Sequence, residues 1–128
     1  MTEALNYIGT EWRKAGQDNS IDVRNPATAG SIGRVVLSTG EDLDLAVDVA
    51  TASFRAWRRT PLEDRIQPMF RLKALLDAHI GELSDLLTRE NGKTLAESKG
   101  ELKRAIENVE VACGTPTLMQ GDFLEDVA

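Results

Sequence analysis

The spacing of apolar residues changes its period once along this chain, and that change limits the folds it can adopt. Residues 5–38 contain short runs of β-branched and aromatic residues, interrupted by glycines and a proline. Such runs are typical of short strands joined as hairpins. From Thr39 onward the apolar residues recur every three or four positions, which is the period of an amphipathic α-helix. We therefore expect an α/β chain, with β hairpins over 1–38 and helices over 39–128.

The helical part contains three apolar stripes, and each stripe predicts one helix. A threonine precedes each stripe and is followed three residues later by an acidic residue, which is the pattern of a capping box. In that motif the threonine hydroxyl accepts a free backbone N–H and the acid bonds back to the threonine N–H. The stripes run from Leu43 to Trp57, from Met69 to Leu87 and from Leu95 to Cys113, and the capping threonines are Thr39, Thr60 and Thr94.

Prolines and a glycine predict how these elements are connected. Asn25-Pro26 favours a turn between two strands, because proline keeps the preceding residue out of the helical region. Pro61 fits the first position of the second helix, and Pro68 should kink that helix by removing one backbone hydrogen bond. Gly92 can adopt the left-handed conformation that ends a helix, so the second and third helices should meet at a tight corner.

Composition excludes several classes of function. The 128 residues carry a net charge of −6, and no block rich in lysine and arginine offsets it, which disfavours binding to nucleic acid or to an anionic membrane. Apolar content of 41% and charged content of 28% are ordinary for a soluble domain. No apolar run approaches the roughly 20 residues of a membrane span, and the first residues do not resemble a secretory signal. We expect a cytoplasmic protein.

The residues alone do not indicate a catalytic centre. One cysteine excludes an internal disulfide and a cysteine-based zinc site. The one histidine, His79, leaves no His/Cys cluster, and we expect no Ser-His-Asp triad. Cys113 continues the stripe of the third helix and is expected to pack as a small apolar residue. His79 falls beside the leucine stripe of the second helix and is expected at its boundary with solvent. The glycines do not have the spacing of a phosphate-binding loop, and no metal site is expected.

A polar face opposite the third stripe is the one candidate for ligand binding. It contains four residues at spacings of four, three and four: Glu97, Glu101, Arg104 and Asn108. The simpler interpretation is a solvated surface with a weak Glu101–Arg104 ion pair. The alternative is that Arg104 receives an anion, because its planar guanidinium matches the two oxygens of a carboxylate.

Five longer segments follow one another in an order that is typical of one protein family. They are "NYIGTEW", "IDVRNPATAGSIGRV", "EDLDLAVDVATASFRAW", "LLTRENGKTLAESKGEL" and "IENVEVACGTPTLMQGDFLEDVA". In this order they resemble the N-terminal part of aldehyde dehydrogenases, and the last is similar to the CoA-acylating methylmalonate-semialdehyde dehydrogenases. The chain departs from that pattern at Pro68 and in "NPATAGSIG", where the family usually has "NPATGE".

This resemblance implies that the chain is the incomplete opening of an NAD-binding domain. Family members are several times longer and also have a catalytic domain and an oligomerisation arm, which supports homo-oligomers. Their nucleophilic cysteine and the residues that contact the cofactor lie beyond the part that this chain resembles. Cys113 matches none of these residues, so no catalytic residue is expected here. NAD and CoA are expected as cofactors of the intact enzyme, and neither is expected to bind the 128 residues alone.

The resemblance gives one residue a role. In the methylmalonate branch an arginine in the helix after the "GK" corner binds the carboxylate of the semialdehyde substrate, and "KRAIENVE" places it at Arg104. In the family a cysteine thiolate attacks the aldehyde, hydride passes to NAD, and CoA takes over the acyl group with loss of CO2. The chain alone should therefore be inactive. Two alternatives stay open: a stand-alone helical module that docks on a full-length subunit, and a truncated remnant without function.

Overall fold

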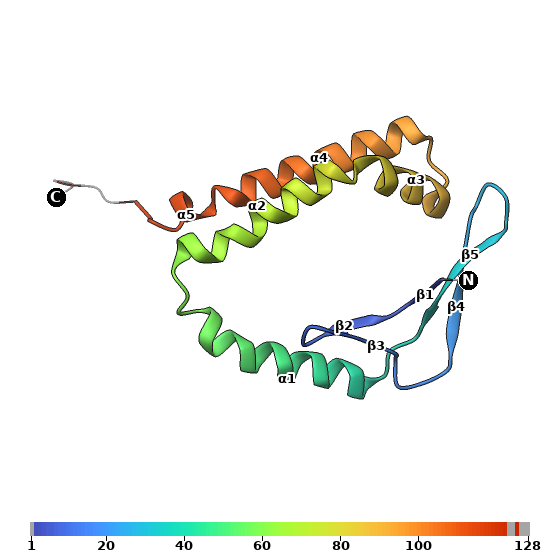
Figure 1. Cartoon of the computed structure of the whole chain (residues 1–128), viewed down its shortest axis with the longest axis horizontal. Coiled ribbons are helices and arrows are strands. Elements are labelled where there is room, and N and C mark those ends of the chain that lie inside the picture. The colour runs from blue at the N-terminus through green and yellow to red at the C-terminus, as the bar shows by residue number, and fades with distance from the viewer. Residues whose placement is uncertain (1, 123–124, 126–128) are drawn as a thin grey trace.

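The computed structural model describes residues 2–122 and 125 of the chain. Strands come first and helices follow, as the change of period predicts (Figure 1). The strands are β1 (Thr2–Ala4), β2 (Asn6–Ile8), β3 (Glu11–Arg13), β4 (Ser20–Arg24) and β5 (Ser31–Val36). The helices are α1 (Gly40–Trp57), α2 (Leu62–Ala78), α3 (Ile80–Asn91), α4 (Leu95–Cys113) and α5 (Thr115–Leu118).

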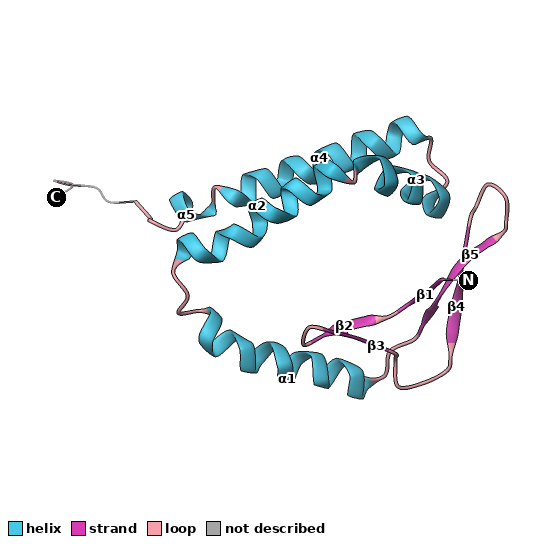
Figure 2. Ribbon diagram, in the orientation of Figure 1, coloured by secondary structure: helices cyan, strands magenta, loops and turns pink. Residues whose placement is uncertain are grey.

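The strands form two antiparallel hairpins, which confirms the prediction for this part. β2 pairs with β3, and β4 pairs with β5. β5 also pairs on its other side with β1, and this pairing is parallel. The sequence did not predict β1, because its partner lies about thirty residues further along and no local pattern marks it. Figure 2 shows β4 and β5 at the end of the molecule where α3 lies, while β2 and β3 extend toward the middle beside α1.

The turn between β4 and β5 is built around Asn25. Its side-chain oxygen accepts the backbone N–H of Ala27 at 2.9 Å, and its carbonyl accepts the N–H of Ala29 at 2.8 Å. Asn25 N–H donates to the carbonyl of Gly30 at 2.9 Å, which closes the loop. The predicted turn is confirmed. Ala29 has φ +59°, so an alanine occupies a left-handed position that favours glycine.

Replacing Ala29 by glycine is therefore expected to stabilise the chain by about 1 kcal/mol. Glycine removes the contact between Cβ and the carbonyl in the left-handed region, and this gain exceeds the extra entropy of the unfolded chain. Urea unfolding followed by circular dichroism measures the difference. Ala27→Gly, at a position of the same turn without a positive φ, is the matched control and should destabilise. If the urea midpoint of Ala29→Gly were at or below that of the unchanged chain, the backbone at Ala29 would not be strained.

Two of the three predicted capping boxes form. The hydroxyl of Thr39 accepts the N–H of Asp42, and that of Thr94 accepts the N–H of Glu97. The Asp42 carboxylate also accepts the N–H of Gly16 at 3.0 Å, so it joins the β3–β4 loop to α1. Hydrogen bonds from the backbone of Gly16, then from the backbone and hydroxyl of Thr39, lower the pKa of Asp42.

The capping box predicted at Thr60 is wrong. α2 begins at Leu62, and Pro61 is its N-cap with φ −50° and ψ 145°, without a side-chain bond to the helix. Because the extended proline shifts the start by one residue, the Thr60 hydroxyl is out of register with the free N–H groups. Thr60 instead donates its N–H to the carbonyl of Trp57 at 3.1 Å.

The second predicted helix is divided into α2 and α3. The break is at His79, with φ −105° and ψ 12°, and not at Pro68, which lies inside α2. Backbone bonds continue on both sides, from His79 N–H to Leu75 and from Leu83 N–H to the His79 carbonyl. Since only one residue leaves the helical conformation, the apolar stripe keeps its spacing across the break. Because the stripe is continuous, its period predicted one helix where the structure has two.

The corner at Gly92 forms as predicted. Gly92 ends α3 with φ +84°, and Thr94 caps α4 two residues later. α3 and α4 then pack closely, because Ser84 and Ser98 are fully buried and the hydroxyls of Thr88 and Ser98 lie 2.8 Å apart. The helical part was expected to extend to residue 128. α5 ends at Leu118, and residues 123–124 and 126–128 lie outside the described part of the chain.

Much apolar surface stays uncovered. Among the described residues the buried apolar side chains are Ile8, Ile106 and Cys113, and α1 buries none of its residues. The accessible surface is 9944 Å², whereas a compact monomer of 14.0 kDa exposes about 6,700 Å². In Figure 1 α2 and α4 run side by side, while α1 crosses the opposite side of the molecule. The uncovered apolar face of α1 consists of Leu43, Val47, Phe54 and Trp57.

Candidate functional site

Arg104 lies on the exposed side of α4 and lines a surface hollow. The hollow has a volume of about 330 Å³ and is lined by Lys93, Glu97, Gly100, Glu101 and Arg104. These residues come from the corner after Gly92 and from the first turns of α4. A methyl group placed on Gly100 would lie 3.9 Å from Nη1 of Arg104, so the guanidinium folds back over the bare backbone of that glycine. Side chains on a helix point toward its N-terminus, which explains this direction.

The first acid of the polar face is engaged by the helix cap. Glu97 accepts the N–H of Thr94 at 2.9 Å and its hydroxyl at 2.8 Å. The hydrogen bond from the Thr94 backbone, then that from its hydroxyl, lowers the pKa of Glu97, and the charge of Lys93 acts in the same direction. Glu97 is therefore an ionised residue of the capping box, with its oxygens directed to the start of the helix.

The second acid is engaged by a lysine from the corner. The carboxylate of Glu101 forms an ion pair with the ammonium of Lys93, and both side chains are partly exposed. The Glu101–Arg104 pair of the simpler interpretation does not form. In the described part of the chain Arg104 has no hydrogen bond or ion pair. A guanidinium thus stands in a hollow beside two acids that are both engaged elsewhere.

The other residues singled out in the sequence do not line this hollow. Asn108 shares the face of Arg104 but does not line the hollow. Cys113 is a free, buried cysteine on the packed side of α4, which confirms its structural role. His79 is exposed at the α2–α3 boundary, and its Nδ1 lies 3.1 Å from the carboxylate of Glu82. A boundary position was predicted for it. The sequence analysis gave no role to Lys93, which lines the hollow. Its position directly after the helix-ending Gly92 was the available signal.

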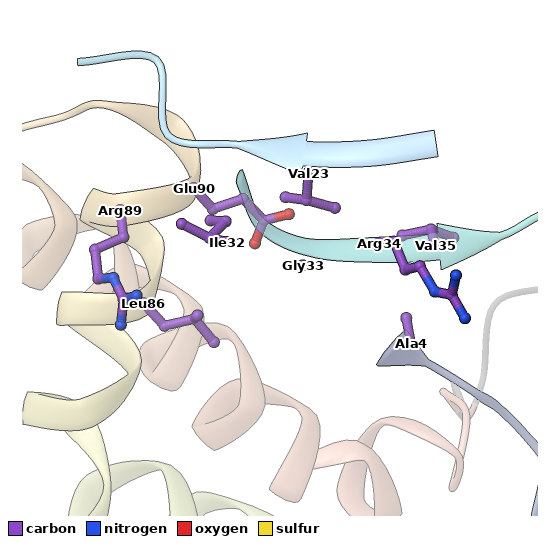
Figure 3. Close-up of a pocket in the computed structure, with 9 residues that line it drawn as sticks. All are labelled: Ala4, Val23, Ile32, Gly33, Arg34, Val35, Leu86, Arg89 and Glu90. Carbon is purple, nitrogen blue, oxygen red and sulfur yellow. The ribbon is translucent and has the colours of Figure 1, made fainter. Parts of the chain in front are cut away.

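A larger cavity of about 350 Å³ lies between the sheet and α3 (Figure 3). Its lining is mostly apolar and comprises Ala4, Val23, Ile32, Gly33, Arg34, Val35, Leu86, Arg89 and Glu90. Figure 3 shows Arg89 and Arg34 at opposite ends of the group, and Arg34 is already bonded to Glu3. Arg89, like Arg104, has no hydrogen bond or ion pair in the described part of the chain. We place the candidate site at the hollow of Arg104, although it is slightly smaller, because the family resemblance gives this arginine a role in binding a carboxylate.

Residues 2–122 and 125 contain neither a metal-binding cluster nor a membrane-spanning helix. Within those residues no group of three or more His, Cys, Asp or Glu side chains could hold a metal ion. None of the helices in that part is both long enough and apolar enough to cross a membrane.

Short β hairpins followed by capped, packed helices define an α/β arrangement, and Arg104 lines a hollow on its last long helix. The family model for the aldehyde dehydrogenase family matches residues 12–127. The chain belongs to the aldehyde dehydrogenase family.

Two curated relatives within this family are named as malonate-semialdehyde dehydrogenases. Malonate-semialdehyde dehydrogenase 2 of Oceanobacillus iheyensis is 45% identical over 123 residues, which are 96% of this chain and 25% of that protein. Malonate-semialdehyde dehydrogenase 1 of Geobacillus kaustophilus is 42% identical over 127 residues, which are 99% of this chain and 26% of that protein. The chain thus spans about a quarter of the length of these relatives.

Two solved structures of semialdehyde dehydrogenases superpose closely on this chain. A protein assigned as methylmalonate-semialdehyde dehydrogenase from Sinorhizobium meliloti, in complex with NAD, superposes with a TM-score of 0.90 at 30% identity. The match covers 100% of this chain and 26% of that one. A succinate-semialdehyde dehydrogenase from Burkholderia pseudomallei superposes with a TM-score of 0.87 at 32% identity, covering 97% and 26% of the two chains. The arrangement of strands and helices is therefore that of the N-terminal region of this family.

Proposed function

We propose that this chain is the N-terminal quarter of an NAD-dependent, CoA-acylating dehydrogenase for malonate or methylmalonate semialdehyde. It forms the opening part of the NAD-binding domain, and Arg104 receives the carboxylate of the substrate. The named relatives support the substrate class, because malonate and methylmalonate semialdehyde each carry a carboxylate beside the aldehyde. A cytoplasmic location and homo-oligomeric assembly remain predictions from the sequence and the family.

The free guanidinium of Arg104 is the observation that carries this proposal. A carboxylate presents two oxygens in one plane, and an arginine fork can donate two parallel N–H bonds to them. Arg104 has no internal partner in the described part of the chain, so it keeps its donors available to a ligand. Its task is to bind and orient the substrate, while the remainder of the enzyme, with NAD and CoA, supplies hydride acceptance and acyl transfer.

The uncovered surface also supports the proposal that the chain is part of a larger protein. The chain exposes about 3,200 Å² more than a compact monomer of its mass. The exposed surface includes the apolar face of α1, and large exposed apolar patches usually mark surfaces that other protein covers. The same surface also fits the alternative of a helical module that docks on a full-length subunit. The coding sequence after codon 128 separates the two, because an open frame that continues into a Gly-Gln-Cys motif favours the enzyme.

A chimera tests the proposal. Residues 1–128 replace the matching quarter of the Oceanobacillus iheyensis enzyme, and NADH formation is followed with malonate semialdehyde, NAD and CoA. We expect the chimera to turn over this substrate and the 128 residues alone to be inactive. The unmodified relative is the positive control. A chimera that circular dichroism shows to be folded but that is inactive would contradict the proposal, as would NADH formation by the 128 residues alone.

A further inference from the structure

We propose that Lys93 is a positioning residue for Arg104. By holding the carboxylate of Glu101, it prevents that acid from occupying the guanidinium that the substrate needs. This inference rests on the proposed function, in which Arg104 binds the substrate carboxylate, and it adds a residue to which neither the sequence patterns nor the family resemblance gave a role.

Glu101 is the natural competitor for Arg104. It lies three residues earlier on α4, and side chains at this spacing are neighbours on a helix surface. An acid on the N-terminal side of a base is also the favourable order for such a pair. Both residues line the same hollow, so no intervening element keeps them apart. A free Glu101 would therefore compete with an incoming carboxylate for the same N–H donors.

Lys93 removes this competitor. It follows Gly92, whose left-handed conformation turns the chain from α3 into α4. From that corner its side chain reaches past the first turn of α4 to Glu101, eight residues ahead, and pairs with its carboxylate. The ion pair balances the charge of the acid and restrains its carboxylate at the Lys93 ammonium. Glu101 is thus held from outside its own helix.

Other features of the hollow have the same effect. Glu97, the other acid of the hollow, is bonded to Thr94 through the capping box and cannot turn toward Arg104 without breaking that cap. Gly100 stands in the middle of α4, where glycine is a poor helix former, and leaves open space under the guanidinium. Both acids are therefore held away from Arg104, and Gly100 leaves room beside the guanidinium. A site that binds a carboxylate requires both conditions.

The test uses the same chimera and two aldehydes. Lys93→Met should raise the KM for malonate semialdehyde about two- to fivefold, the range expected for one exposed ion pair, and leave kcat unchanged. Propanal has the same chain length but no carboxylate, so its KM and kcat should not change. Lys93→Arg retains a cation for Glu101 and should behave like the parent chimera.

Second-site variants separate positioning from a general loss of positive charge. Lys93→Met combined with Glu101→Gln should restore the KM, because the competitor is gone. Lys93→Met combined with Glu97→Gln removes the same charge from the other acid and keeps a side chain suited to the capping box, so it should not restore the KM. Equal rescue by both pairs would overturn the inference, as would an unchanged KM in Lys93→Met or an equal rise for propanal.

Arg104→Leu in the same series keeps the two proposals distinguishable. If this variant loses affinity for malonate semialdehyde while Lys93→Met does not, the inference about Lys93 fails and the proposed function stands. If Arg104→Leu binds malonate semialdehyde as well as the parent chimera does, the proposed function fails, and the role of Lys93 fails with it.

Discussion

Replacing Arg104 by leucine in the chimera is expected to lower kcat/KM for malonate semialdehyde by about 10- to 100-fold. The physical reason is the loss of a charge-assisted, two-bond contact to the substrate carboxylate. Hydrogen bonds to charged groups contribute about 1.5–3 kcal/mol, and each 1.4 kcal/mol corresponds to a factor of ten. Propanal lacks the carboxylate, so its kcat/KM should stay within about twofold of the parent value. Steady-state NADH formation with both aldehydes measures the contrast.

Lys103→Leu is the matched control for this variant. Lys103 is the next residue on α4, is exposed and has no partner in the described part of the chain, so its replacement removes the same charge outside the hollow. It should leave both substrates unaffected. Arg104→Lys should retain part of the affinity, because an ammonium keeps the charge but not the planar fork. Equal losses for malonate semialdehyde and propanal in Arg104→Leu would show that the residue supports the fold and not the carboxylate.

Replacing Gly92 by alanine is expected to destabilise the chain by about 2–5 kcal/mol. Gly92 has φ +84°, where a side chain costs about 1–2 kcal/mol. In addition, a Cβ at this position would lie 2.6 Å from Cγ of Pro26, closer than two carbon atoms can approach. The proline ring is stiff and belongs to the β4–β5 turn, so relief requires the corner and the turn to separate, at a cost typical of overpacking.

Urea unfolding of the 128-residue chain, followed by far-UV circular dichroism, measures this effect. Gly81→Ala is the control, because a methyl group there meets nothing within 4 Å and no positive φ is required. It should be neutral or slightly stabilising, since alanine is the better helix former. Pro26→Ala combined with Gly92→Ala should recover part of the loss, because the clash is relieved while the left-handed strain remains. An unchanged midpoint in Gly92→Ala would mean that the corner is not fixed by these contacts.

Local chemistry made part of the fold predictable from the sequence. Asn25-Pro26 specifies its turn through bonds to the next few residues, and Thr39 caps a helix through an acid three residues away. Gly92 ends its helix because of its own backbone freedom. Each of these signals acts within about one helical turn. The Thr60 capping box failed for the same kind of reason, since the adjacent proline alone displaced the helix start.

The candidate site was only half predictable. Arg104 could be chosen from the helix period and the family resemblance, but its partner could not. The i, i+3 spacing favoured Glu101 as that partner, whereas the structure gives Glu101 to Lys93. The break at His79 was also missed, because a single residue can leave the helix without disturbing the apolar stripe.

By itself the sequence determined where most turns, caps and helix ends lie, and which face of the last long helix is polar. Those features depend on atoms joined by a few bonds, which the order of residues fixes. Only the tertiary structure decided that β1 joins β5, that Gly92 lies against Pro26, and that the guanidinium of Arg104 stays free. These are choices among competing partners, and they depend on which atoms come within reach once the corner between α3 and α4 has turned.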